Sequence, residues 1–537
     1  MLRRQFLAGL ASALTFASLL PRISNGAQKT GFAHGVASGD PSQNAVILWT
    51  RVSGVSKSTR VRWSVARDKD MQKVVRRGRT KATADTDFTI KVDAGRLPAG
   101  STLYYQFEAN GVKSPVGRTK TLARGDLSTA SLAVVSCSNH PYGYFHVYRE
   151  IAKRDDLDAV LHLGDYIYEY AMGEYATQYA ESLDRVPQPE QELRTLSDYR
   201  QRYQQYRSDP DLQAMHAQQA FIPVWDDHEL ANDAWKNGAE NHQEGEGDWS
   251  SRRDIAIQAW LEWMPVRVRH QGARTRIYRQ FRFGNLLSLL MLDTRMVGRD
   301  LQPDAKPGVS REDIIAAMRD PSRRLLGDKQ EAWLGEALEN SSNATWQALG
   351  QQVMVMPNLS PELEPILDLD KPAILDRETL QGFIEATRGN PPMLLDTWNG
   401  YPAARQDLLM QLKEKAKNAV VLSGDLHTAM AGSLVPQGES ETVAVELMTS
   451  AVTSPGFTEY LPEIRPGAFN EATKAVNPHL SYMDSAQKGW LCVTFSKTDC
   501  VAEWHAIEGI RNKEYSSRID HRLSVKAGQI KAGLLEA

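Results

Sequence analysis

The chain has 537 residues, more than one ordinary domain holds, and its 42% apolar and 24% charged residues are typical of a globular protein. Beyond the N-terminus no apolar run reaches the roughly 18 residues that a transmembrane helix needs. The formal net charge of −3 provides no basic footprint for nucleic acid, so a nucleic-acid partner is not expected.

The first residues have the features of a targeting segment. The sequence RRQFL at positions 3–7 is a twin-arginine pattern, and the apolar stretch Leu7–Leu20 is too short to span a membrane. Small residues at positions 24–26 offer a cleavage site. Residues 1–27 are therefore predicted to be a twin-arginine signal peptide. The twin-arginine export machinery is then a partner, and the mature protein is periplasmic or secreted.

Residues 28–126 predict an all-β sandwich of the immunoglobulin or fibronectin kind. Short strands separated by turns rich in Gly, Pro and Asp are expected at Ala45–Trp49, Val61–Val65, Phe88–Val92 and Leu103–Glu108. No cluster of titratable side chains stands out here, so a packing or orienting role is expected for this domain.

Residues 127–537 predict a second, α/β domain, because strand-like and helical patterns alternate. Strands are expected at Leu132–Val135, Ala159–Leu163, Ala220–Val224, Leu286–Leu292, Trp346–Met354 and Ala419–Leu422, with Val443–Met448 and Gly489–Phe495 completing one large sheet. Helices are expected at Tyr144–Lys153, Thr195–Tyr206, Asp211–Gln219 and Ala403–Lys417. Asn237–Trp249 predicts a loop and Pro361–Asn399 an irregular excursion. The charged segment Arg511–Ala537 predicts a C-terminal helical extension that folds over the mouth of the pocket.

Two cysteines near the C-terminus, Cys492 and Cys500, flank a probable hairpin turn. A disulfide and two unpaired buried thiols are both compatible with this spacing, and the unpaired state is favoured. Cys137 is the third cysteine, so an odd number is present and at least one thiol is free or takes part in chemistry.

Polar residues of a particular kind follow several of the expected strands. Cys137 follows the first of them, Gly164-Asp165 the second, and Asp227-His228 the third. Asp425 and His427 follow the strand Ala419–Leu422. Ligands bind open α/β sheets at the carboxyl ends of the strands, and these residue types are the ligands of a two-metal hydrolytic site.

A phosphate ester fits such a site, because two cations neutralise the oxygens that repel a nucleophile. Asp165 is the candidate bridging carboxylate, and Asp425 and His427 are placed to reach one metal each. His228 is the candidate proton donor to the leaving oxygen. Arg295, which follows the strand Leu286–Leu292, has two interpretations: it holds the phosphate, or it forms a structural ion pair with Asp293.

Five motifs in order along the chain resemble the PhoD-type alkaline phosphatases and phosphodiesterases, a divergent branch of the calcineurin-like metallophosphatases. They are GVASGDP at 35–41, SCS at 136–138, GDYIYE at 164–169, WDDHE at 225–229 and GDLH at 424–427. The resemblance implies an exported hydrolase of phosphate monoesters and diesters. It also implies a four-layer α/β metallophosphatase sandwich behind the β-sandwich, with a ferric ion and calcium (Fe3+ and Ca2+) at its centre.

The same resemblance assigns metal ligands position by position. It places Cys137, Asp165, Tyr168 and His427 on the ferric ion. It places Asp165, Asp227, Asn232 and Asp425 on calcium, although Asn232 also suits the start of a helix.

Three positions depart from the wider superfamily. Cys137 stands where an Asp-x-His is usual, Asp227 replaces an asparagine, and Asp425 replaces a histidine. Fewer imidazoles and more carboxylates favour hard ions over a di-zinc centre.

The expected function is therefore phosphoester hydrolysis by attack of a metal-bound hydroxide. One alternative is a phosphodiesterase of phospholipase D-like specificity on the same centre. A second is a non-catalytic, calcium-dependent surface binding protein built on the β-sandwich. The natural substrate and the oligomeric state are not predicted by the sequence.

Overall fold

The computed structural model describes residues 29–267, 276–303, 309–368, 377–461, 463–465 and 467–537. The predicted signal peptide, residues 1–27, lies outside the described residues. No helix within these ranges combines the length and the apolar character required to cross a membrane.

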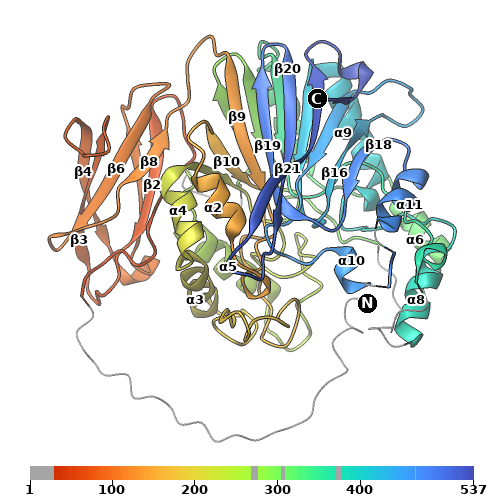
Figure 1. Ribbon diagram of the computed structural model, residues 1–537, viewed down its shortest axis with the longest axis horizontal. Helices are drawn as coiled ribbons and strands as arrows, with labels where there is room; N and C mark the ends of the chain where they lie inside the picture. Colours follow the sequence, from red (N-terminus) through yellow and green to blue (C-terminus); the bar gives the residue numbers. More distant parts are fainter. Residues whose placement is uncertain (1–28, 268–275, 304–308, 369–376, 462, 466) are drawn as a thin grey trace, which may run out of the picture.

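A ten-stranded sheet runs through the middle of the molecule (Figure 1). Its strands β9, β10, β11 and β1 are parallel to one another. In order across the sheet the strands are β22 (Leu535–Glu536), β21 (Ser516–Lys526), β20 (Asp499–Glu508), β19 (Lys488–Ser496), β9 (Thr129–Val135), β10 (Ala159–His162), β11 (Ala220–Pro223), β1 (Val36–Gly39), β2 (Ala45–Arg51) and β5 (Thr89–Gly95).

A second, seven-stranded sheet packs on the first and contains four parallel strands, β13, β14, β15 and β17. In order its strands are β12 (Arg279–Phe283), β13 (Leu287–Met291), β14 (Trp346–Gly350), β15 (Ala419–Ser423), β17 (Ala444–Met448), β16 (Ala429–Leu434) and β18 (Leu480–Asp484). The prediction of one large sheet was therefore wrong: β17 and β19 belong to different sheets. Alternating apolar runs cannot show which sheet a buried strand joins, because strands buried on both faces look alike.

The period of two in the strands divides the apolar side chains between two cores. In β13, Leu289 and Met291 face the ten-stranded sheet, whereas Leu290 packs towards the outer helices; Val420 and Val421 divide in the same way in β15. Helices therefore cover both outer faces, and the result is the four-layer α/β sandwich that the resemblance implied.

The helices on the ten-stranded sheet are α2 (His146–Ala152), α3 (Leu196–Arg207), α4 (Pro210–Gln218) and α5 (Trp249–Trp263). The helices on the seven-stranded sheet are α7 (Asp328–Glu339) and α9 (Pro402–Lys415). The remaining helices are α6 (Arg311–Met318), α8 (Arg377–Thr387), α10 (Phe457–Tyr460) and α11 (Ala468–Val476), with single 3-10 turns η1 (Ala84–Thr86), η2 (His140–Tyr142), η3 (Glu364–Ile366), η4 (Trp398–Gly400) and η5 (Ile530–Ala532).

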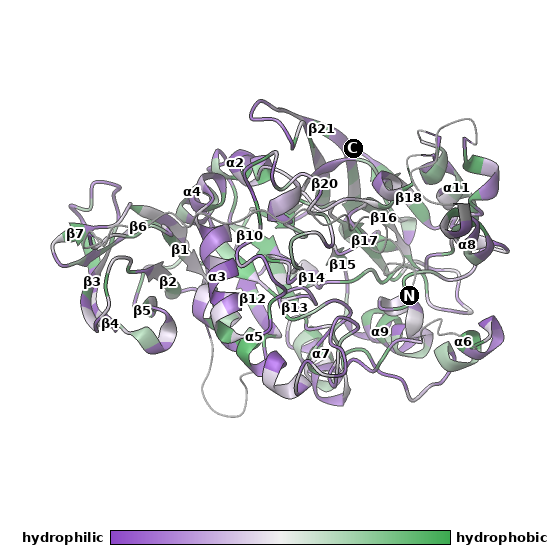
Figure 2. Cartoon of the chain, turned by 90° about the horizontal axis from the view of Figure 1, so that it is seen from below, coloured by the Kyte–Doolittle hydropathy of each residue, from purple (hydrophilic) through white to green (hydrophobic). Residues whose placement is uncertain are grey.

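Helix α3 shows how local sequence fixes an element beside the site. Thr195 caps its first turn and pairs with Asp198 in a capping box. The helix is coloured mostly as hydrophilic in Figure 2, because its buried residues are tyrosines and arginines rather than aliphatic residues. One of them, Arg202, donates to the backbone oxygen of Tyr168. The buried, polar face of α3 therefore supports the loop that carries Tyr168.

The N-terminal β unit has a five-stranded sheet of its own: β4 (Val74–Ala82), β3 (Thr59–Ala66), β6 (Thr102–Ala109), β7 (Val112–Lys113) and β8 (Gly117–Lys120). It packs against β1, β2 and β5, with Val61, Tyr105 and Phe107 facing Val46 and Leu48. Those three strands continue the ten-stranded sheet through the parallel pairing of β1 with β11. The β-sandwich thus shares one sheet with the rest of the molecule.

Two predictions at loop level were wrong. The C-terminal segment forms β21 and the edge strand β22, not a helical extension. It pairs with β20. Leu523 and Val525 are its buried residues and the rest of the strand is exposed or half-buried, so the apolar alternation that indicates a strand is confined to its end. The excursion Pro361–Asn399 contains the helix α8. The three cysteines carry free thiols, which confirms that Cys492 and Cys500 are unpaired.

Candidate metal centre

The predicted ligands meet where strands of both sheets end. Cys137, Asp165 and Asp227 follow β9, β10 and β11 of the ten-stranded sheet, and Asp425 and His427 follow β15 of the seven-stranded sheet. These strands are parallel within each sheet, so their carboxyl ends share an edge. A single parallel bridge between Ser136 and Ala451 joins the two sheets at this edge.

The backbone is strained at the ligand positions. Cys137, Asp165, Asp425 and His427 have φ values of +61°, +55°, +68° and +55°, in the left-handed region that residues other than glycine rarely adopt. Glycines precede two of these turns because the loops touch. A Cβ on Gly164 would lie 2.3 Å from the Cβ of Asp226, and one on Gly424 would lie 2.5 Å from Ser136 Oγ.

Four side chains, one of which provides sulfur and one nitrogen, form one half of the centre. Ligand atoms of Cys137, Asp165 and His427 all lie within 4.8 Å of one another. The Tyr168 hydroxyl donates to Asp165 Oδ2 at 2.9 Å and lies 3.4 Å from His427 Nε2. His427 Nδ1 lies 2.7 Å from the carbonyl oxygen of Pro455, so Nε2 is the nitrogen that faces the centre.

Carboxylates form the other half. Oxygens of Asp165, Asp226, Asp227 and Asp425 lie within 4.8 Å of one another, which makes Asp165 common to both halves. Asp226 was missed in the sequence, although its place beside Asp227 was a signal. The structure also shows that Asn232 lies in a turn, which excludes the helix start; its backbone N–H binds Glu169 and its side-chain amide donates to Glu240.

Burial makes the negative charges of this cluster unfavourable unless positive charge lies beside them. Burial and the neighbouring carboxylates of Asp227 and Asp226 raise the pKa of Asp165 well above its usual range, and burial with Asp226 and Asp396 does the same to the pKa of Asp425. Burial, Asp165 and Asp425 likewise raise the pKa of the Cys137 thiol. Among the described residues, Asp165 Oδ1 and Asp227 Oδ1 are buried without a hydrogen-bond partner. Unpaired buried oxygens next to thiol, phenol and imidazole suit bound cations.

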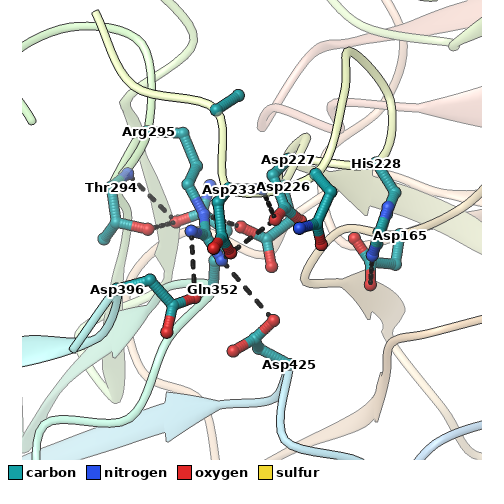
Figure 3. A network of polar contacts seen from close by, with 12 residues as sticks. Asp165, Asp226, Asp227, His228, Asp233, Thr294, Arg295, Gln352, Asp396 and Asp425 are labelled. Carbon is teal, nitrogen blue, oxygen red and sulfur yellow. Dashed lines mark hydrogen bonds and ion pairs between the residues drawn. The ribbon is translucent and has the colours of Figure 1, made fainter. Parts of the chain in front are cut away.

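Arg295 supplies one fixed positive charge inside the cluster (Figure 3). Its side chain is fully buried, and its guanidinium lies 2.5 Å from Asp226, 3.3 Å from Asp396 and 3.5 Å from Asp425. The proposed ion pair with Asp293 was wrong: that carboxylate accepts the backbone N–H groups of Arg295 and Met296 instead. Asp293 was predicted as the partner of Arg295 because it lies two residues before it in the sequence.

His228 is held by a hydrogen bond on one side of its ring. Its Nδ1 lies 2.8 Å from Glu169, and its Nε2 lies 4.0 Å from Asp165 Oδ2. Burial disfavours the charged imidazolium, but the carboxylates of Asp165, Asp227 and Glu169 outweigh burial and raise the pKa of His228. A protonated ring would present its Nε2–H towards Asp165, as a proton donor requires.

Two buried side chains fix the loops to each other. Glu229 belongs to the WDDHE motif but had no predicted role, and no sequence pattern indicated Gln352. Glu229 accepts the backbone N–H groups of Asp165, Tyr166 and Asp226. The side chain of Gln352, which follows β14, accepts from Thr294 and donates to the carbonyl oxygen of Trp225. The backbone carbonyl oxygen of Gln352 accepts the N–H of Gly424. Gln352 thus ties together the loops that carry Asp227, Arg295 and Asp425; Figure 3 shows its contact with Thr294.

Comparison with known proteins gives a consistent result. The family described as PhoD-like phosphatase matches residues 132–504, and the N-terminal domain of the same family matches residues 18–123. The chain is 34% identical over 480 residues to "Alkaline phosphatase D" of Bacillus subtilis, covering 84% of this chain and 76% of that protein. A solved structure entitled "Structure of PhoD" matches with a TM-score of 0.80 and 29% identity, over 96% of this chain and 93% of the other.

Proposed function

The chain belongs to the PhoD-like phosphatases, and from this premise we propose that it is an exported, metal-dependent enzyme that hydrolyses phosphate monoesters, diesters or both. One observation carries the metal part of the proposal. A buried thiol, carboxylate and imidazole from both sheets converge within 4.8 Å, each on a backbone in the left-handed region. Strain of this kind persists only where the surroundings impose it, and it gathers at functional sites.

We assign the ligands as the family resemblance implies. Cys137, Asp165, Tyr168 and His427 would hold Fe3+, because anionic, polarisable donors suit a trivalent ion. Asp165, Asp227, Asn232 and Asp425 would hold Ca2+, which prefers oxygen ligands. When bound, these cations would neutralise the phosphate oxygens and provide a nucleophile near neutral pH.

The side chains of the protein have separate tasks in this scheme. His228 would give its proton to the leaving oxygen, with Glu169 fixing the ring through Nδ1. Arg295 would keep Asp226, Asp396 and Asp425 in place, because its guanidinium is occupied by these carboxylates. Ser454 donates to the Tyr168 oxygen at 2.6 Å and would steady the phenolate.

The first test is turnover and metal content of the purified mature protein. We expect hydrolysis of p-nitrophenyl phosphate or bis(p-nitrophenyl) phosphate, iron and calcium in elemental analysis, and loss of turnover after chelation. Rates on the two esters and on phosphatidylcholine would separate monoesterase, diesterase and phospholipase D-like activity. Turnover of none of these would contradict the function, and full turnover after complete removal of iron and calcium would contradict the metal dependence.

We further propose export through the twin-arginine pathway, on the pattern at positions 3–7. Changing Arg3 and Arg4 together to lysine is expected to leave the precursor in the cytoplasm, whereas the wild-type chain reaches the periplasm or the medium. Fractionation followed by immunoblotting measures this. Unchanged export of the double variant would contradict the proposal.

A further inference from the structure

Two tyrosines lie against the ring of the proposed proton donor, His228, and a third lies against one of them. We name Tyr170, Tyr175 and Tyr460 the tyrosine platform. The ring of Tyr170 lies 5.4 Å from that of His228, and the ring of Tyr175 lies 6.1 Å from it in a stacked arrangement, with 15° between the planes. Tyr460 extends the group, its ring lying 6.3 Å from that of Tyr175.

The platform differs from the metal ligands in burial. His228 and Tyr168 are buried, whereas all three platform tyrosines are half-buried and so keep part of their surface in contact with solvent. Tyr175 also stacks on Tyr168, 5.7 Å away with 22° between the planes. Aromatic surface therefore begins beside the reacting groups and continues outwards.

The platform is assembled from two distant segments. Tyr170 and Tyr175 belong to the loop after β10, and Tyr460 ends the short helix α10 after β17. The loop from β17 also contains Pro455, whose carbonyl oxygen orients His427, so Tyr460 belongs to a segment already fixed at the centre. Because both segments follow strands that end at the metal centre, the platform has a defined position relative to it.

We infer that the tyrosine platform is a binding subsite for the alcohol part of the substrate, and that it selects phosphate esters whose alcohol carries a planar or ring-shaped group. The inference rests on the proposed function. The alcohol oxygen of a bound ester would lie beside the ring of His228. The rings of Tyr170 and Tyr175 adjoin that ring, and Tyr460 extends them. Aromatic faces bind flat, apolar surfaces by stacking, and they give little to a short alkyl chain.

Two phosphonates test the inference at alkaline pH, where both are dianions. Phenylphosphonate and ethylphosphonate are not hydrolysed, and they differ only in the group that would meet the platform. Inhibition constants against p-nitrophenyl phosphate are expected to favour phenylphosphonate in the wild-type enzyme. Tyr175→Leu and Tyr460→Leu are each expected to reduce that preference by about two- to tenfold, while Tyr175→Phe retains it.

The matched control is Tyr482→Leu. Tyr482 is also half-buried, and its ring stacks on the imidazole of His521 at a distance of 4.2 Å. This variant is expected to leave both inhibition constants unchanged. Equal affinity of the wild-type enzyme for the two phosphonates would overturn the inference, as would an equal loss for both in the platform variants, which is the result expected of rings that only support His228. A protein without turnover would contradict the proposed function instead, and the same preference would then be measured by calorimetry.

Discussion

Replacing Cys137 by alanine is expected to remove the iron that we propose it binds and to reduce turnover of an aryl phosphate by more than about 100-fold. The sulfur is fully buried and shares a space of 4.8 Å with Asp165 and His427, so no neighbouring group replaces it. Asp165→Asn should have an effect at least as large, because that carboxylate belongs to both halves of the centre. Elemental analysis and kcat/KM measure the two effects.

The chain provides its own control for this experiment. Cys492 is also buried and also lies in the ten-stranded sheet, in β19, away from the ends of the strands that carry the centre. Cys492→Ala makes the same chemical change, loss of a buried thiol, but at a position away from the centre, so it is expected to keep both iron and turnover. A Cys137→Ala protein with its iron content and rate near the wild-type values would contradict the ligand assignment.

The parts of the fold that the sequence predicted well are those with a local cause. Thr195 and Asp209 precede helices α3 and α4, and their side chains cap the first turns. The expected ranges 195–206 and 211–219 agree closely with these helices. The turns at Gly164 and Gly424 could also be predicted from local sequence. Each follows an apolar strand, and each needs a glycine where another loop touches it.

The parts that were missed depend on contacts between distant segments. Nothing near Leu523 or Val525 indicates that this charged segment pairs with β20, because the pairing depends on a partner strand and not on the segment itself. Gln352 is similar: a glutamine after a strand has no motif, and its importance comes from hydrogen bonds to loops about 60 and 127 residues away. Only the fold brings these partners together.

Arg295 has the second large effect that the structure predicts, on stability and not on substrate affinity. Its guanidinium is fully buried among the carboxylates of Asp226, Asp396 and Asp425. Removing one partner of a buried charge network leaves the others uncompensated, at a cost of about 3–5 kcal/mol. Arg295→Met is therefore expected to lower the free energy of unfolding by that amount when calcium is chelated.

Calcium should restore much of that loss, because an added cation replaces the missing positive charge and binds the folded state in preference to the unfolded chain. The measurement is denaturant unfolding with chelator and over a calcium titration. Arg299→Met is the control: Arg299 is equally buried, but it donates to the carbonyl oxygen of Ala234 and to Gln302. That variant also loses stability, but calcium should stabilise it no more than it stabilises the wild-type protein. If Arg295 held the substrate phosphate instead, Arg295→Met would raise KM and leave the chelated protein as stable as the wild type.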